Sequence, residues 1–207
     1  MRIVCISDTH EQQYTVPDGD ILIHAGDLTF NGREDKTKEA LDLLNSFPHK
    51  NKLLVAGNHD WLFDRHKSLA KSYLGNVIYL ENQGVTINNT TFWGSPWQPY
   101  FNDWAFNLAR GEPMRKIWAQ IPNKLDVLIT HSPPFGILDI VPGHFEKPNV
   151  GCLDMLDRVI KVKPKLHIFG HIHHSYGECK LDGIHFINAA LCNENYQLYN
   201  PPIIVDL

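Results

Sequence analysis

This chain has few cysteines, only a small excess of negative over positive charge, and no long apolar run. Its 207 residues include four cysteines, none of them in a CxxC pair, which excludes a disulfide-rich fold and favours a reduced compartment. No apolar run approaches the roughly 18 residues that span a bilayer. The net charge of −4 argues against stable binding to nucleic acid or to an anionic membrane. A first strand starting at Arg2 leaves no room for a signal peptide, so we expect a cytoplasmic protein.

The overall composition is that of an ordinary globular domain. Hydrophobic residues make up 43% of the chain and charged residues 20%. Internal repeats, low-complexity segments and linkers are absent from the sequence. We therefore predict one domain over residues 1–207, with an unknown oligomeric state.

Short polar motifs rich in Asp, Asn and His are the main feature of the sequence, and each follows an apolar run. The motifs are Asp8-Thr9-His10, Gly26-Asp27, Gly57-Asn58-His59-Asp60, Thr130-His131 and Gly170-His171-Ile172-His173. The runs before them are 3–6, 21–23, 53–56, 127–129 and 166–169. Continuous apolar runs of this length indicate strands that are buried on both faces. Polar residues at the ends of such strands usually line a ligand site.

The residue types in these motifs point to metal binding. Carboxylate oxygen and imidazole nitrogen suit divalent ions. Asp8 and His10 alternate along an extended segment, so both can face one ion. Asp27 is a lone carboxylate that can bridge two ions, and His171 and His173 can serve the two ions separately.

Amphipathic segments between the motifs predict helices. They cover 38–47, 61–74 and 112–121, and a fourth helix is marked by Leu153, Leu156, Val159 and Ile160. Further strands are expected at 77–80, 85–87, 91–93, 184–187 and 203–205. Two stretches, 94–104 and 132–151, resist a regular interpretation, and long ordered loops are often functional.

Several residues outside the predicted ligands could have either a structural role or a role at the site. We expect His24 and His167, which lie inside apolar runs, to be hydrogen-bonded core residues. Asp60 is expected to orient His59 or to cap the next helix. The aromatic residues of 93–104 either stack on a nucleobase or pack under a loop. Weaker candidates for substrate contact are His144, His174 and Trp97, and Asn188 is a weak candidate for supporting the site.

The order D-x-H, G-D, G-N-H-[DE], a later H and G-H-x-H resembles the calcineurin-like metallophosphoesterase superfamily. The segments 26–29, 94–99, 130–134 and 170–177 resemble its class III phosphodiesterase group, which includes the fetal-brain metallophosphodiesterases. The resemblance covers nearly the whole chain. It implies an α/β (α+β) four-layer sandwich, in which two mixed β-sheets lie face to face between helices, with a dimetal site at the carboxyl ends of strands.

The resemblance also implies a role for each motif residue. Asp8, His10, Asp27 and His173 would hold one metal, and Asp27, Asn58, His131 and His171 the other. The two ions would be Mn, Fe or Zn. His59 would stay off the metals as the catalytic acid, and Asn58 and His59 would also contact substrate.

The function expected from these features is hydrolysis of small-molecule phosphodiesters such as nucleotides or cyclic nucleotides. A hydroxide that bridges the two ions would attack phosphorus. Two alternatives stay open. One is a phosphomonoesterase or protein phosphatase of the same superfamily, although no arginine lies in or beside a metal motif. The other is a non-catalytic scaffold, although all eight motif positions are present.

Overall fold

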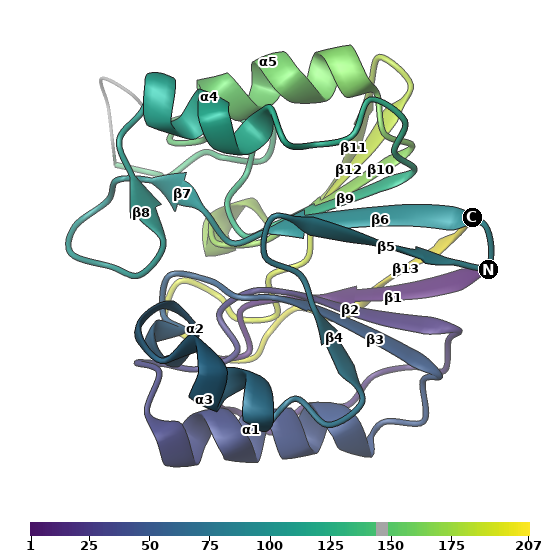
Figure 1. Ribbon diagram of the computed structural model, residues 1–207, viewed down its shortest axis with the longest axis vertical. Helices are drawn as coiled ribbons and strands as arrows, with labels where there is room; N and C mark the ends of the chain where they lie inside the picture. The colour runs from purple at the N-terminus through teal and green to yellow at the C-terminus, as the bar shows by residue number, and fades with distance from the viewer. Residues whose placement is uncertain (144–148) are drawn as a thin grey trace.

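Two mixed β-sheets lie face to face in the computed structural model, which describes residues 1–143 and 149–207 (Figure 1). The first sheet has the strand order β13-β1-β2-β3-β4 and the second β11-β12-β10-β9-β6-β5. The strands of the first sheet are β1 (Arg2–Ile6), β2 (Ile21–Ala25), β3 (Asn51–Val55), β4 (Val77–Tyr79) and β13 (Ile203–Asp206). Those of the second are β5 (Gln83–Ile87), β6 (Thr90–Ser95), β9 (Val127–Thr130), β10 (Leu166–Phe169), β11 (Gly177–Leu181) and β12 (Ile184–Asn188). A separate short pair is formed by β7 (Gln98–Pro99) and β8 (Asn107–Leu108).

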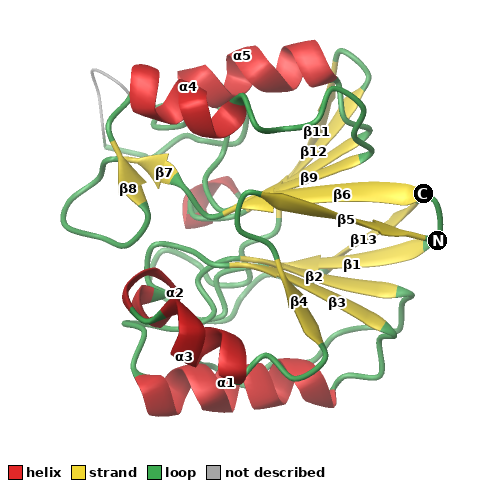
Figure 2. Cartoon of the chain, in the orientation of Figure 1, coloured by secondary structure: helices red, strands yellow, loops and turns green. Residues whose placement is uncertain are grey.

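The helices cover the outer faces of the two sheets (Figure 2). Outside the first sheet lie α1 (Glu34–Ser46), α2 (Trp61–Arg65) and α3 (Lys67–Ser72). Outside the second lie α4 (Glu112–Trp118) and α5 (Leu153–Val162), and a single 3-10 turn, η1, covers His173–Ser175. The expected four-layer sandwich of the α/β (α+β) class is confirmed. None of the helices in residues 1–143 and 149–207 has the length and apolar character needed to cross a membrane.

Burial on both faces explains why the strands read as continuous apolar runs. In β1, Ile3 and Cys5 face the layer between the two sheets, whereas Val4 and Ile6 pack in the cluster that includes the α1 residues Leu41 and Leu44. A third cluster joins the second sheet to α4 and α5. Alternate residues of one strand therefore serve two apolar layers, so most positions on both faces are apolar.

The strands that precede the motifs all run in the same direction within their sheets. β1, β2 and β3 are parallel neighbours in the first sheet, as are β9 and β10 in the second. The two sheets are connected at the carboxyl ends of these strands: the Ser7 amide donates to the Ala189 carbonyl at 2.9 Å, and the His171 amide donates to Oδ2 of Asp8 at 3.0 Å. All five motifs therefore meet at one edge of the sandwich.

Two helix predictions were wrong in detail. The helix expected over 61–74 is two short helices, α2 and α3, because His66 has φ −132° and ψ 52°, outside the helical region. We expected its inner face to hold Leu62, Leu69 and Tyr73. Leu62 is buried and Tyr73 is half-buried, but Leu69 is exposed and Ala70 is buried instead. In α5, Met155 and Val159 are buried, whereas Leu153 and Ile160 are exposed. Which residues of these helices are buried therefore depends on how each helix packs on the rest of the molecule.

Helix boundaries also shifted by a few residues. α1 begins at Glu34 rather than 38, and α4 ends at Trp118 rather than 121. After α4 the chain forms a turn, in which the amide of Ile121 donates to the Trp118 carbonyl at 3.1 Å. The expected positions of the strands are confirmed within a residue or two.

Candidate metal centre

Three overlapping groups of Asp and His side chains lie at the edge where the five motifs meet. Each group brings possible ligand atoms within 4.8 Å of one another. The groups are Asp8-His10-His173, His10-Asp27-His59 and Asp27-His131-His171. These residues follow β1, β2, β3, β9 and β10, so strands of both sheets contribute. Within the described residues, the structure thus gathers every predicted ligand that carries a carboxylate or an imidazole.

The first end of the cluster is built by the β1 and β10 motifs. The Nε2 atom of His173 lies 3.3 Å from Oδ1 of Asp8 and 3.4 Å from Nε2 of His10. His10 Nε2 is in turn 3.9 Å from Oδ2 of Asp27. Two imidazole nitrogens and two carboxylates therefore converge on one small region, as the prediction for the first metal requires.

The second end is built by the motifs after β2, β3 and β9. His131 Nε2 lies 3.3 Å from Oδ1 of Asp27 and 2.9 Å from Oδ1 of Asn58. The ring of His171 lies 4.9 Å from that of His131, centroid to centroid. Asp27 thus turns one oxygen towards each end of the cluster, which is the placement a bridging carboxylate needs.

Backbone carbonyls fix the orientation of the histidine rings. The Nδ1 atoms of His10, His131 and His173 lie 3.1, 3.0 and 2.8 Å from the carbonyls of Thr29, Ala25 and Asn193. A carbonyl only accepts, so each Nδ1 carries a proton and each Nε2 atom faces the cluster. Metal-binding histidines are commonly held in this way. The donor set therefore fits divalent metal ions.

The backbone is unusual at four of the seven predicted ligands. Asp8, His10, Asp27 and His171 have φ values of 52°, 44°, 55° and 69°, in the left-handed region that non-glycine residues rarely adopt. Such conformations cost of order 1–3 kcal/mol each and occur mainly at functional sites. The strain is localised where the side chains must converge.

Two glycines allow the carboxylates to be approached closely. A Cβ atom on Gly57 would lie 2.2 Å from Oδ1 of Asp27, and one on Gly170 would lie 2.1 Å from Oδ2 of Asp8. Both distances are far below van der Waals contact. A side chain at either position would displace a predicted ligand, which explains the glycine in each motif.

The two carboxylates of the cluster are ionised, and neighbouring histidines lower their pKa values. Burial would raise the pKa of Asp8, but the hydrogen bond and charge of His173 outweigh it and hold the pKa well below its usual range. The pKa of Asp27 is likewise lowered against burial, mainly by the charge of His131. Burial opposes protonation of His131, yet Asp27 raises its pKa to about 9. Without metal, His131 therefore supplies the positive charge that Asp27 requires.

His59 lies at the same cluster, between aromatic rings. Its Nδ1 atom is 2.6 Å from the Phe30 carbonyl and its Nε2 atom is 3.9 Å from Oδ2 of Asp27. The ring of Trp104 packs on it at a centroid distance of 4.2 Å. Its distances to His10 and Asp27 also suit a metal ligand. Its predicted place off the metals therefore stays a prediction.

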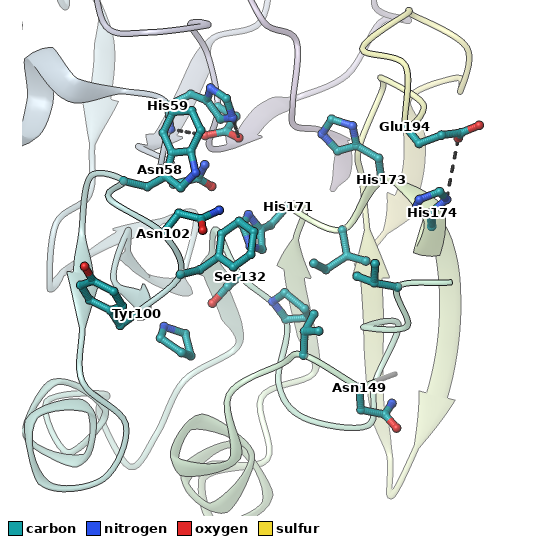
Figure 3. A pocket seen from close by; sticks show the side chains of 18 of the residues that line it. Asn58, His59, Tyr100, Asn102, Ser132, Asn149, His171, His173, His174 and Glu194 are labelled. Carbon is teal, nitrogen blue, oxygen red and sulfur yellow. Dashed lines mark hydrogen bonds and ion pairs between the residues drawn. The ribbon is translucent and has the colours of Figure 1, made fainter. Parts of the chain in front are cut away.

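A cavity of about 620 Å³ opens from the cluster (Figure 3). Asn58, His59, His171 and His173 line it near the cluster, whereas Tyr100 and Asn149 lie further away. Much of the remaining wall comes from the two stretches that resisted a regular interpretation, through Pro99, Tyr100, Phe101, Asn102, Trp104, Ser132, Pro133, Val141, Asn149 and Val150. Both irregular loops therefore border the candidate site. This volume suits a small-molecule ligand.

The weaker sequence candidates have varied positions. His174 lines the cavity and faces Glu194 across 3.8 Å. Trp97 packs against Phe106 at 5.7 Å beneath the loop and is not among the described residues that line the cavity, so its placement does not support substrate contact. His144 lies outside the described residues. Among the aromatic residues, Trp93 is buried, whereas Tyr100 and Phe101 are exposed at the cavity.

The expectation for Asp60 was wrong. Its side chain makes no capping hydrogen bond to α2, and the His59 ring is instead hydrogen-bonded to the Phe30 carbonyl. It accepts hydrogen bonds from the amides of Leu28, Thr29 and Gly57 and from the Thr29 hydroxyl, at 2.8 to 3.2 Å. Asp60 therefore ties the loop after β2 to the loop after β3. The sequence cannot show this tie, since Leu28 and Thr29 lie about 30 residues from Asp60.

His24 and His167 are hydrogen-bonded core residues, as expected, and Asn188 contacts the backbone of a motif. The Nε2 atoms of the fully buried His24 and His167 lie 2.9 Å from the Thr9 and Thr130 hydroxyls, each beside a predicted ligand. Asn188 donates to the Ile172 carbonyl at 2.8 Å, between His171 and His173. These contacts position the motifs without touching the cluster.

Sequence reasoning missed an aromatic pair that covers one end of the cluster. The ring of Tyr196 lies 4.9 Å from His10 and 5.2 Å from His173, and Phe30 lies 5.0 Å from Tyr196. Tyr196 has a φ of 58° in a turn held by the Asn193 carboxamide. The asparagine-rich segment 193–195 was the available signal for this turn.

Comparison with known proteins identifies the family. The pattern of the calcineurin-like phosphoesterase family matches residues 1–175. Human metallophosphoesterase domain-containing protein 1 is 41% identical over an alignment that covers all of this chain and 71% of the relative, and the mouse protein gives the same values. The phosphopantetheinyl hydrolase of Mycobacterium tuberculosis shares the fold, with a TM-score of 0.64, 17% identity and coverage of 94% of this chain and 90% of that one. Proteins of this family carry a dimetal site, and the clustered Asp and His residues supply possible ligands for one here. The chain therefore belongs to the calcineurin-like phosphoesterase family, whose members are metallophosphoesterases.

Proposed function

We propose that this chain is a dimetal-dependent phosphodiesterase that hydrolyses small-molecule phosphoesters such as nucleotides or cyclic nucleotides. The observation that carries the proposal is the position of Asp27. One of its oxygens is 3.3 Å from His131 Nε2 and the other is 3.9 Å from His10 Nε2, so a single carboxylate serves both ends of the cluster. The N and O donors around it suit Mn, Fe or Zn.

The two ends of the cluster would each hold one ion. Asp8, His10, Asp27 and His173 would hold the first, and Asp27, Asn58, His131 and His171 the second. Two bound divalent ions supply positive charge for a phosphate group and acidify water. The fixed histidine rings and the strained backbone keep the donor atoms in place before any ligand arrives, so little reorganisation is needed on binding.

In this proposal His59 would move a proton at the substrate. The Phe30 carbonyl accepts the Nδ1 proton, so the Nε2 atom is the one that faces Asp27 and the cavity. A proton on Nε2 would pass to the oxygen of the departing alcohol. General acid catalysis of this kind typically contributes about 10²–10⁴ in rate.

The preference for diesters rests on the charges around the cavity. Arg110 is the one arginine among the described residues that line it, and its guanidinium donates to the carbonyls of Gly151 and Val150 at 2.7 and 2.8 Å. It is therefore engaged with the wall. A monoester dianion carries one more negative charge than a diester and gains more from additional arginines. A phosphomonoesterase stays the second candidate, because the same metals would serve it.

A substrate panel on metal-reconstituted protein tests the proposal. It should compare bis(p-nitrophenyl) phosphate, 2′,3′- and 3′,5′-cyclic nucleotides and p-nitrophenyl phosphate, with chelated protein as the control. We expect turnover of diesters to exceed that of the monoester, and the chelated protein to be inactive. Faster hydrolysis of the monoester would make the phosphomonoesterase correct. Two bound metals without turnover of any ester would leave only the scaffold.

A further inference from the structure

Arg110 connects the two irregular stretches that border the cavity. It lies two residues after β8, and its Nη1 and Nη2 atoms donate to the carbonyls of Gly151 and Val150 at 2.7 and 2.8 Å. Arg110 and Val150 both line the cavity. Hydrogen bonds from a charged group are stronger than neutral ones, and two of them from one planar guanidinium fix the direction of both carbonyls. The end of the second stretch is therefore fastened to the segment after β8.

A buried carboxylate lies on the other side of the same peptide group. The Gly151 amide donates to Oδ2 of Asp139 at 2.9 Å, and Asp139 is fully buried. The Val150 carbonyl and the Gly151 amide belong to one peptide group, and in a trans peptide they point in opposite directions. The guanidinium of Arg110 therefore bonds one edge of this group, and the carboxylate of Asp139 bonds the other.

The shared peptide group couples the two charges. A cation at the carbonyl oxygen and an anion at the amide hydrogen polarise the peptide in the same sense, so each hydrogen bond strengthens the other. A buried carboxylate also needs hydrogen bonds to replace the water that it has lost. Asp139 receives them from the Gly151 amide, from the Gly136 amide at 2.9 Å and from the Asn149 side chain at 2.6 Å. Arg110 strengthens the first of these donors.

Glycine at position 151 permits this close arrangement. A Cβ atom on Gly151 would lie 2.5 Å from the carbonyl oxygen of Pro134 and 2.8 Å from Oδ2 of Asp139. Both distances are below van der Waals contact. A side chain at this position would push the peptide group away from the carboxylate, so the residue type fits the contact.

The strand before Arg110 holds the opposite wall of the cavity. In β8, the Asn107 side chain accepts from the Phe101 amide at 3.3 Å and donates to the carbonyls of Phe101 and Asn102 at 3.3 and 3.0 Å. Phe101 and Asn102 line the cavity. One short segment therefore fixes both walls, the first through Asn107 and the second through Arg110.

We infer that Arg110 and Asp139 form an ion pair that acts through the peptide group between Val150 and Gly151, and that this pair positions the second wall of the cavity for the organic part of the substrate. Both are positioning residues, since neither belongs to the Asp and His cluster. The identity of the ligand rests on the proposed function. The ion pair belongs to the chain itself and can be measured without turnover.

Amide hydrogen exchange tests the ion pair. Arg110→Met and Asp139→Asn should each speed exchange of the buried Gly151 amide by about 10-fold, the size of one hydrogen bond to a charged group. Asp139→Asn keeps the shape and one acceptor oxygen, and the Asn149 carboxamide can turn to accept from the new amide, so mainly the charge is lost. Exchange in β10 should not change, which shows that the fold is intact.

The double variant shows whether the two side chains act together. Because both substitutions break one chain of hydrogen bonds, the Gly151 amide of the double variant should exchange no faster than that of the faster single variant. Effects that multiply, or an unchanged rate in Arg110→Met, would overturn the ion pair.

Calorimetry on metal-loaded protein tests the role for the substrate. It compares diphenyl phosphate, whose rings extend beyond the phosphate, with inorganic phosphate, which reaches only the cluster. Arg110→Met should weaken binding of diphenyl phosphate about 10-fold and that of phosphate less than about 2-fold, because a loosened wall must be ordered on binding. Arg158→Met is the matched control. Arg158 also donates to a backbone carbonyl, that of Ile121, but is not among the described residues that line the cavity, so both affinities should stay unchanged.

The outcomes are distinct. Equal losses for diphenyl phosphate and phosphate would mean that Arg110 attracts any anion through its charge, and would overturn the positioning role. Unchanged binding of diphenyl phosphate to Arg110→Met would overturn it as well, even if the Gly151 amide exchanges faster. Metal-loaded protein that shows the expected losses but hydrolyses no diester would sink the proposed function and leave the inference standing.

Discussion

At the scale of single residues, Asp27 connects the two halves of the candidate centre. Its two oxygens face His131 and His10, and the amide of His59 donates to Oδ1 at 2.9 Å. It is 2% exposed, so water screens its charge less than it would at the surface. The loss of this carboxylate should therefore affect both ends of the cluster together.

Asp27→Asn should lower the occupancy of both metals and reduce turnover by at least about 10³-fold, because one side chain serves both ions. Elemental analysis of the purified variant, together with diester hydrolysis, measures both effects. Glu39→Gln, at an exposed position on α1, is the control for metal loss during purification. Two tightly bound metals and a near-normal rate in the variant would rule out the bridging role.

His59 has two possible roles that one substitution can separate. If it donates a proton to the leaving group, His59→Gln should retain both metals and lose about 10²–10⁴ in rate for poor leaving groups. The loss should be smaller for p-nitrophenyl esters, whose leaving group departs as a stable anion. The measurement is the slope of log rate against leaving-group pKa, which should steepen in the variant.

The alternative outcomes for His59 are equally specific. An unchanged slope with a lower rate would mean that the ring orients the phosphate and does not protonate the alcohol. Loss of one metal from the variant would show that His59 is a ligand, as its distances to His10 and Asp27 allow. The roles of the other histidines would then have to be reassigned.

At the scale of elements, the loops at the carboxyl ends of the strands are tied to one another. Asp60 connects the loop after β2 to the loop after β3 through four hydrogen bonds. Burial raises the pKa of Asp60 to about 6, aided by the charge of Asp27, while these hydrogen bonds favour the ionised form. The contact therefore keeps the Asp27 and Asn58 segments in register.

Asp60→Asn should destabilise the metal-free protein by about 1–3 kcal/mol, because the amide nitrogen cannot accept the hydrogen bonds that the lost oxygen accepted. Urea unfolding in the presence of a chelator measures this change. Asp42→Asn is the matched control, since Asp42 is exposed on α1. Equal stability of the two variants would show that the tie between the loops contributes little.

At the scale of the whole molecule, one buried histidine lies in each sheet. His24 in β2 and His167 in β10 are fully buried, and burial lowers the pKa of each to about 3. Both are therefore neutral in the folded protein and take up a proton on unfolding below the ordinary histidine pKa of 6.5. Their contribution to stability is present above about pH 6.5 and is lost as the pH falls from there towards 3.

Replacing one of these histidines should therefore reduce the acid sensitivity of the metal-free protein. Each buried histidine contributes up to about 1.4 kcal/mol per pH unit in that window. The free energy of unfolding of His167→Gln should fall less steeply between pH 6.5 and 5 than that of the unmodified protein. Denaturant unfolding at several pH values measures the slopes, with His185→Gln, on the strand beside it, as the control. Parallel slopes would mean that His167 is protonated in the folded state.

The sequence by itself determined the strands that carry the motifs and the identity of the predicted ligands. Continuous apolar runs leave little choice of structure when both faces are buried, so β1, β2, β3, β9 and β10 follow from residue type. Polar motifs at the ends of parallel strands meet at one edge, which is why Asp8 and His131 could be grouped in advance. The ligand roles stay predictions until metal content is measured.

Only the tertiary structure decided which residues surround the cluster. The packing of Phe30 on Tyr196 and the hydrogen bonds from Leu28 and Thr29 to Asp60 join segments that are distant in the sequence, so local patterns do not predict these contacts. The break at His66 between α2 and α3 was hidden for the same reason, since packing against the sheet and not helix propensity sets the register. The spacing of apolar residues along a segment predicts which of its faces are buried. Only the packing of segments that are distant in the sequence decides which side chains reach the site.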